Sequence, residues 1–338
     1  MQSSQTIDRK QRIFGYDALK ALAAFFVVLY HVGMVDKGYR EGVYYYPTLV
    51  QLLWLFCGCG VPLFFMVNGA LTVSRHYDFK KTLNKSSRLL LIGVFWGVLV
   101  MCEHAAFDGT DCFTIREIPY YWFLFSLALM YVASFVLGQI NSWCKWAVVV
   151  ILLIFPFTTN LFWVFVQLFR PEMHLPKWFH TGVFTLYGLV YLYAGDYLAH
   201  HRVDKRMVWV GAILGLALLA LETIAVVNRT HAPFEGGNYC FPSWGALFLS
   251  CSLFILIKGW NPVASKLKGI ITFLGNNALG IYILHLMVMF LLAHLFPQVA
   301  NCTVHPVLAI VIALAYMFVS AFISEMIRRS PLSFLLKL

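Results

Sequence analysis

Long apolar runs separated by short polar segments fill almost the whole chain, and the apolar positions within each run are continuous rather than alternating. A helix needs about 20 apolar residues to cross the hydrocarbon core of a membrane. Only helices and closed barrels satisfy their backbone hydrogen bonds there, and continuous runs favour helices. The pattern therefore predicts an all-α polytopic membrane protein, a single bundle of about ten transmembrane helices at approximately 16–34, 49–73, 88–106, 120–138, 143–158, 179–199, 207–228, 240–258, 270–296 and 306–327. The fifth segment is short and is expected to close at Pro156.

The composition agrees with this pattern. Of the 338 residues, 61% are hydrophobic and 12% are charged, whereas a soluble domain has about 25% charged residues. The mean hydropathy is +0.76. Because the ten segments leave no room for a soluble domain, we expect one membrane domain over 1–338, with short tails at 1–15 and 328–338. The eight cysteines show no metal-ligand spacing, so no metal site is predicted.

The distribution of Lys and Arg predicts the orientation, because cytoplasmic loops are enriched in both. With a cytoplasmic N-terminus, 19 of the 25 basic residues fall inside, and those outside are Lys37, Arg40, Arg116, Arg170, Lys177 and Arg229. Both termini are therefore expected in the cytoplasm. The net charge of +10 mostly reflects this bias and does not indicate nucleic-acid binding, since the basic residues lie at membrane edges. The first segment looks like an uncleaved anchor rather than a signal peptide.

The first segment contains two ionisable residues on one helix face. Lys20 and His31 are eleven residues apart, which is about three helical turns and a rise of about 16 Å. Asp17 precedes Lys20 by three residues and is placed to pair with it. Ionisable groups inside membranes are candidates for function. The alternative is that Lys20 extends to the interface and His31 only bonds a neighbouring helix.

A second basic group, Lys85-Ser-Ser-Arg88, lies at the mouth of the third segment. Lys85 and Arg88 are three residues apart and share a face, where they could hold phosphate groups. Lysines and arginines in a short loop are also expected simply as a determinant of orientation. From the residues alone, that second explanation is favoured.

Several polar residues fall at a similar outer depth in different segments. His31, His285, Glu103 and Glu222 are predicted to converge on a polar pocket if their helices are neighbours. Tyr282 lies three residues before His285 and faces the same way. An aromatic residue of the group Tyr120, Tyr121 and Trp122 could stack on a sugar, although interface aromatics are common in membrane proteins.

These residues resemble the motifs of the acyltransferase-3 family of bacterial membrane enzymes. The similar segments are the Lys20 to His31 spacing, Val61-Pro-Leu-Phe-Phe-Met-Val-Asn-Gly69, Lys85-Ser-Ser-Arg88, Trp122-Phe-Leu and Leu274-Gly-Asn-Asn-Ala-Leu-Gly-Ile-Tyr-Ile-Leu-His285. They occur in order over nearly the whole chain. Asn68 stands where Ser is usual, Lys85 where Arg is usual and Ile92 where Pro is frequent. The chain resembles the stand-alone branch, which has no appended esterase-like domain.

The resemblance implies a membrane O-acyltransferase of the bacterial plasma membrane. The donor would be acyl-coenzyme A, with acetyl-CoA the first expectation, and the acceptor a cell-surface or lipid-linked saccharide. His31 would act as the catalytic base or as a transient acyl carrier. Lys20, Lys85 and Arg88 would hold the coenzyme phosphates. Glu103, Trp122, Glu222, Tyr282 and His285 would line the substrate pocket, where Glu103 or Glu222 could orient the His31 ring.

Two other functional classes remain at this point. A flippase or transporter for lipid-linked sugars also uses buried His and Glu, for proton relay. The chain shows no inverted repeat, however, and such repeats are common in transporters. A non-catalytic scaffold would give no function to the helix face that carries Lys20 and His31. The acyltransferase is therefore the leading hypothesis.

Overall fold

The computed structural model describes residues 13–35, 39–40, 43–44, 56–74, 78–108, 121–169, 185–230, 242–262, 264–299 and 305–336. Within these ranges the chain forms eleven α-helices: α1 (Phe14–Val35), α3 (Gly60–Thr72), α4 (Phe79–Asp108), α5 (Trp122–Gln139), α6 (Ser142–Phe169), α7 (Gly188–His200), α8 (Lys205–Thr230), α9 (Trp244–Lys258), α10 (Ser265–Asn276), α11 (Ala278–Leu295) and α13 (Pro306–Arg329). Two 3-10 turns, η3 (Thr185–Tyr187) and η4 (Pro331–Leu335), accompany them. Strands β1 (Tyr39–Arg40) and β2 (Val43–Tyr44) form a two-residue antiparallel pair that aligns Tyr39 with Tyr44.

Every predicted segment coincides with at least one of these helices. The first parts of the segments 49–73, 179–199 and 240–258 lie outside the described residues. Among the described helices, seven are long and apolar enough to span a membrane, namely α1, α4, α5, α6, α8, α11 and α13. The helices α3, α7 and α9 are shorter, with 13, 13 and 15 residues. The all-helical membrane architecture predicted from the sequence is confirmed.

The predicted end of the fifth segment at Pro156 is wrong. Helix α6 continues through this proline to Phe169. Membrane helices tolerate an internal proline because neighbouring groups compensate for the lost hydrogen bond. The next residue, Phe157, is fully buried, and its ring centroid lies 5.8 Å from that of Tyr191 and 5.6 Å from that of Trp244. This packing against α7 and α9 holds α6 in place on both sides of the proline.

The predicted segment 270–296 is also not one helix, because α10 ends and α11 begins at Asn277. The Asn277 amide donates to Phe273 O at 3.0 Å and to Glu325 Oε2 at 3.1 Å, and its oxygen accepts from Ser324 Oγ at 2.8 Å. Side-chain amides that bond nearby backbone compete with helix continuation. The contacts to α13 fix the break.

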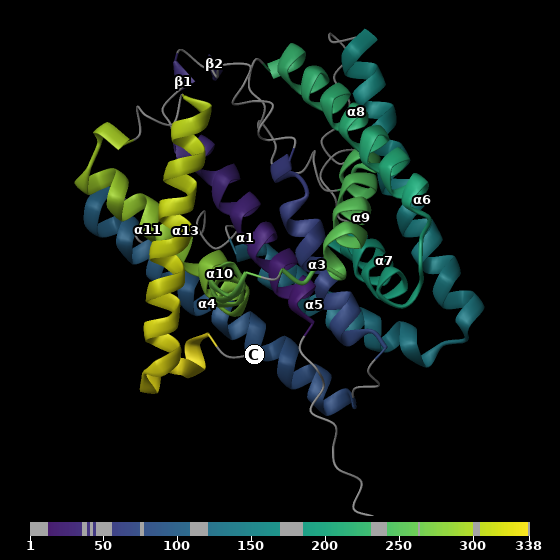
Figure 1. The fold of residues 1–338 in the computed structure, drawn as a ribbon, viewed down its shortest axis with the longest axis horizontal. Coiled ribbons are helices and arrows are strands. Elements are labelled where there is room, and N and C mark those ends of the chain that lie inside the picture. Colours follow the sequence, from purple (N-terminus) through teal and green to yellow (C-terminus); the bar gives the residue numbers. More distant parts are fainter. Residues whose placement is uncertain are drawn as a thin grey trace, which may run out of the picture.

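Helix α1 lies at the centre of the bundle and contacts α3, α9, α10, α11 and α13. In Figure 1, α11, α13 and the middle of α4 lie on one side of α1, and α6, α7, α8 and α9 lie on the other. The core between them contains fully buried Val28, Leu63, Phe65, Leu124 and Ile281. Apolar side chains are left exposed on the outer faces of α6, α8 and α13, as expected for surfaces that face lipid.

Helices α3 and α7 approach each other most closely, through reciprocal glycines. A side chain at Gly69 would collide with the backbone of Leu192, and a side chain at Gly195 would collide with the backbone of Met66. Small residues allow membrane helices to pack backbone against backbone, where van der Waals contact replaces the hydrophobic driving force. This contact joins two short helices that are distant in sequence into one unit beside α1.

Candidate functional site

Two histidines from opposite ends of the chain meet in the bundle. His31 lies near the end of α1 and His285 lies in α11, and His285 Nε2 is 3.2 Å from His31 Nδ1. Their ring centroids are 4.9 Å apart, with the planes at 61°. His285 is 1% exposed. Of the four residues predicted to converge on a polar pocket, the structure thus brings these two into direct contact.

The backbone around the pair decides which ring nitrogens carry protons. His31 Nδ1 lies 2.8 Å from Val27 O, and His285 Nδ1 lies 2.6 Å from Tyr282 O. Because a carbonyl oxygen only accepts hydrogen bonds, we assign a proton to Nδ1 in both neutral rings. His285 Nε2 then accepts from His31 Nδ1–H, a donor that it shares with Val27 O. This leaves the lone pair of His31 Nε2 as the basic group of the pair.

Aromatic side chains form a wall beside His285. The Tyr282 ring lies 6.0 Å from the His285 ring and 5.1 Å from the ring of Phe123 on α5. Tyr121 donates its hydroxyl to Ile283 O at 3.0 Å, which ties the start of α5 to α11. The structure therefore places Tyr282 next to the histidines, as its spacing from His285 predicts.

The two predicted acidic residues lie in different places. Glu103, in the last turns of α4, lies within electrostatic range of Tyr121 and so belongs to the side of the bundle that holds His285. Glu222 lies on α8, where both of its carboxylate oxygens are 2.6–2.7 Å from Ser243 Oγ. Ser243 also caps α9 by accepting from Ala246 N at 3.1 Å. Among the described contacts, Glu222 therefore stabilises the α8–α9 pair rather than the histidine pair.

Lys20 lies on α1 three turns before His31 and pairs with Asp17, whose Oδ1 is 2.8 Å from Lys20 Nζ. The ion pair predicted from their spacing is confirmed. The Asp17 side chain is 5% exposed and that of Lys20 is 27% exposed. Both residues belong to one continuous helix. The Lys20 cation therefore remains accessible at one end of this helix face, and the imidazole of His31 lies about 16 Å farther along the helix axis.

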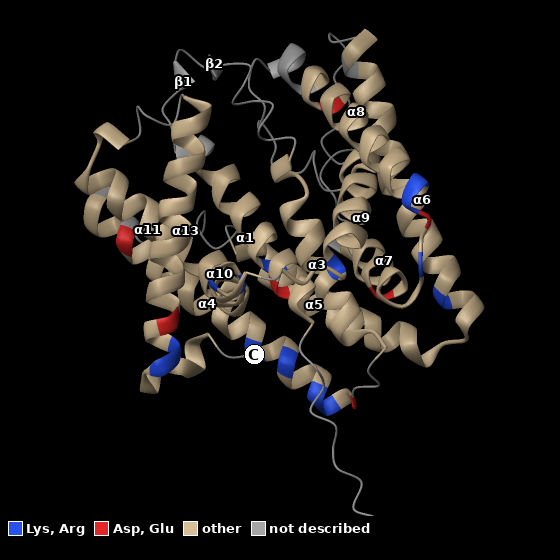
Figure 2. Cartoon of the chain, viewed as in Figure 1, with Lys and Arg blue, Asp and Glu red and all other residues tan. Residues whose placement is uncertain are grey.

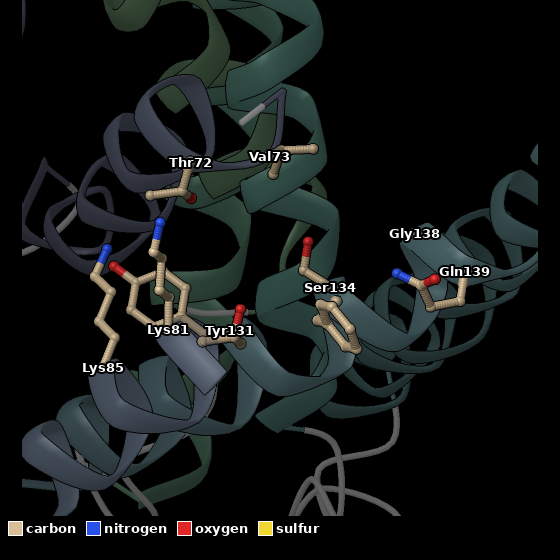
Figure 3. A pocket seen from close by; sticks show the side chains of 10 residues that line it. Thr72, Val73, Lys81, Lys85, Tyr131, Ser134, Gly138 and Gln139 are labelled. Atoms are coloured by element: carbon tan, nitrogen blue, oxygen red, sulfur yellow. The ribbon is translucent and has the colours of Figure 1, made fainter. Parts of the chain in front are cut away.

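A small basic pocket of about 80 Å³ lies between α3, α4 and α5. It is lined by Lys81, Lys85 and Tyr131, and Figure 3 shows both lysine side chains directed toward the Tyr131 side. Lys85 Nζ lies 4.0 Å from the centroid of the Tyr131 ring. Tyr131 in turn donates to Asn68 Oδ1 at 2.7 Å. The pocket has room for a phosphate-sized group and offers two cations to it.

The pocket differs in one residue from the basic pair predicted by sequence. Lys85 lines it, but its partner there is Lys81, one turn earlier, whereas Arg88 is exposed and is not among the lining residues. The sequence pattern did not single out Lys81, because it places this residue in a cytoplasmic loop whose basic residues are explained by the orientation of the chain in the membrane. Its spacing of four from Lys85, which places both on one helix face, was the available indication.

The remaining predictions concern Trp122 and its neighbours and the expectation that there is no metal site. Trp122 opens α5 half-buried against the core, next to Tyr121, and Tyr120 lies outside the described residues. Within the described ranges, no group of three or more His, Cys, Asp or Glu side chains is placed to hold a metal ion.

Comparison with known proteins gives one match. The family model described as an acyltransferase domain, that of the acyltransferase-3 family, matches residues 13–326. No curated protein and no solved structure matches the chain. The matched range contains His31, His285, Lys20, Lys81 and Lys85, so it covers both the histidine pair and the basic pocket.

Proposed function

Because the chain belongs to the acyltransferase-3 family and is a multi-pass membrane acyltransferase, we propose that it transfers an acyl group, acetyl in the first instance, from acyl-CoA to a saccharide hydroxyl. The acceptor is a cell-surface or lipid-linked saccharide, and the enzyme works in the bacterial plasma membrane as a member of the stand-alone branch. The observation that best supports an acyl transfer centre is the contact between His31 and His285.

In the proposed reaction, His31 Nε2 is the general base. The acceptor hydroxyl oxygen attacks the thioester carbonyl carbon, and its proton passes to His31 Nε2. The C–S bond breaks, an ester forms, and the departing coenzyme thiolate takes the proton from His31. His285 Nε2 accepts from His31 Nδ1–H throughout and stabilises the transient imidazolium, because hydrogen bonds to charged groups are stronger than neutral ones.

The basic pocket supports a binding site for the charged head of the donor. Lys81 and Lys85 bind phosphate groups of the coenzyme between α3, α4 and α5. Lys20 on α1 and Arg88 on α4 contact the remaining phosphates in this proposal. Only the thin pantetheine arm then needs to enter the bundle and extend toward His31.

This mechanism requires a two-sided topology, with ten crossings and both termini in the cytoplasm. Figure 2 shows Lys and Arg on the first turns of α4 and the last turn of α13, as that orientation requires. Reporter fusions after Asp78 and Asp204 should read cytoplasmic, and a fusion after Asp111 should read external. The reverse pattern would rule out a cytoplasmic donor at Lys81 and Lys85.

The reaction class is tested by transfer of radiolabelled acetyl from acetyl-CoA to membrane glycolipid. We expect transfer by the wild-type chain, its loss in His31→Ala, and its retention in His200→Ala, which removes an exposed histidine at the end of α7. Label on the purified protein without acceptor would replace the base mechanism with an acyl-histidine intermediate. Absence of transfer by the wild type would refute acetyl-CoA as donor, and equal transfer by His31→Ala would remove His31 from catalysis.

A further inference from the structure

A groove of about 600 Å³ runs between α6, α7, α8 and α9, apart from the histidine pair and the basic pocket. Its walls include Trp146 and Leu153 on α6, Ala194 on α7, Met207 on α8 and Phe248 on α9. Small-molecule sites in proteins have volumes of about 300–1,000 Å³. The groove is therefore large enough for a ligand, and the proposed acyl transfer makes no use of it.

The walls of the groove suit hydrocarbon. The lining consists of aliphatic, aromatic and sulfur-containing residues and Ser252, and its hydroxyl groups belong to Ser252, Tyr193 and Tyr197. Ser252 Oγ is already bonded to Val208 O and Phe248 O, both at 2.9 Å. The groove opens to the outside of the bundle, since the lining residues Val150 and Met207 are 45% and 65% exposed. In a membrane, that side faces lipid.

Cations gather at one end of the groove. The lining residue Trp146 is preceded by Lys145, whose Nζ lies 5.7 Å from the Trp146 ring centroid. The lining residues Val203 and Met207 bracket Asp204, Lys205 and Arg206, and Arg202 directly precedes Val203. Figure 2 shows Lys and Arg at the starts of α6 and α8.

The acidic residues near this end are already engaged. Asp204 Oδ1 accepts from the Arg206 backbone N–H at 2.9 Å, and Asp196 Oδ1 accepts from Ser74 Oγ at 2.5 Å. Lys258 donates to the carbonyls of Leu198 and His201, which adds a further cation at the same end. The mouth of the groove therefore has an excess of positive charge.

We propose that this groove binds one anionic glycerophospholipid, with an acyl chain between α6 and α8 and the phosphate headgroup at Lys145, Arg202, Lys205 and Arg206. A hydrocarbon chain fills an apolar space that opens to the membrane, and basic residues at the membrane surface attract anionic headgroups. The lipid lies in the leaflet that holds the first turns of α6 and α8. It fills the space between these helices and stabilises the half of the bundle that contains α7.

The test uses the full-length protein in phosphatidylcholine vesicles with trace phosphatidylglycerol that carries a diazirine in its acyl chain. After irradiation, adducts should concentrate on groove residues such as Ala194, Met207 and Phe248. Unlabelled phosphatidylglycerol should abolish them at lower concentration than added phosphatidylcholine. Adducts spread evenly over exposed apolar residues such as Leu91 on α4 and Phe322 on α13 would indicate ordinary surrounding lipid and overturn the proposal.

Two variants separate the chain site from the headgroup site. Val150→Trp fills the groove from its exposed edge and should abolish the groove adducts. Lys145→Gln with Arg206→Gln should reduce the preference for phosphatidylglycerol by at least about fivefold. The matched control, Lys80→Gln with Lys266→Gln, removes two cations elsewhere and should leave the preference unchanged. An unchanged preference in the first double variant would refute the headgroup site.

A measurement on the unmodified chain guards against misfolding of the variants. Cys251 lines the groove, whereas Cys102 is exposed on α4. Added phosphatidylglycerol should slow modification of Cys251 by a small membrane-permeant maleimide without slowing that of Cys102. Equal rates with and without the anionic lipid would contradict the proposal. So would a dimer in detergent that Val150→Trp dissociates, because a second copy of the chain would then occupy the groove.

Discussion

The contact between His31 and His285 allows a graded prediction for catalysis. His285→Leu introduces an apolar side chain of similar size and removes the acceptor that lies 3.2 Å from His31 Nδ1. The His31 ring becomes a cation as it takes the hydroxyl proton, and a hydrogen bond to a charged group contributes about 1.5–3 kcal/mol. Because Val27 O, 2.8 Å from His31 Nδ1, still accepts this proton in the variant, the expected loss is at the lower end of this range, about 10-fold in kcat. The KM for acetyl-CoA should change little, because His285 lies away from the basic pocket.

The assay is the initial rate of acetyl transfer in membranes with matched amounts of folded protein. His285→Gln returns an amide oxygen to the acceptor position and should recover most of the lost rate. His200→Leu serves as the control for removing a histidine. A rate for His285→Leu within about twofold of wild type would refute the assigned hydrogen bond, given its expected strength. A loss as complete as that of His31→Ala would show instead that His285 takes the proton.

Three other predictions address the donor site and the packing of the bundle. Lys85→Met should raise the KM for acetyl-CoA about fivefold without changing kcat, and Lys80→Met should change neither. Gly195→Val should lower the free energy of unfolding by at least about 3 kcal/mol, because the Met66 backbone cannot move aside. The control Gly269→Val, where a side chain meets open space, should be tolerated in the same melting experiment. Asn277→Ala loses its bonds to α13 and should cost about 2 kcal/mol by denaturation, and a change below about 0.5 kcal/mol would contradict its role at the helix break.

Much of the fold follows from the sequence because the membrane restricts the backbone so strongly. Within the described residues, each predicted apolar segment contains at least one helix. The errors arise where side chains override the apolar pattern. The segment 270–296 looks continuous by hydropathy, but Asn277 finds partners on α13 that favour a break. Pro156 suggests an end, but the packing of Phe157 supports continuation. Both outcomes depend on contacts between distant helices, which hydropathy does not encode.

For the candidate site, the sequence predicted reliably only the contacts between residues of the same helix. The spacing of Lys20 and Asp17 gave their ion pair, and the spacing of Tyr282 and His285 gave their proximity. Depth in the membrane suggested that His31 and His285 could meet, but the same argument included Glu222, which instead binds Ser243. Depth orders residues along the membrane normal, whereas neighbour relations within the membrane plane come from helix packing. The roles of these residues in catalysis and binding remain predictions that the experiments above address.

The reciprocal glycines of α3 and α7 also have a consequence for biosynthesis. The described helices α3 and α7 have 13 residues each, and the long helices α4, α5 and α6 are made between them. The nascent α3 therefore leaves the ribosome well before the partner whose backbone it must touch. We expect the translocon to hold α3 at its lateral gate until α7 emerges. A ribosome stalled before α7 should then leave α3 extractable from the membrane, and one stalled after α7 should not.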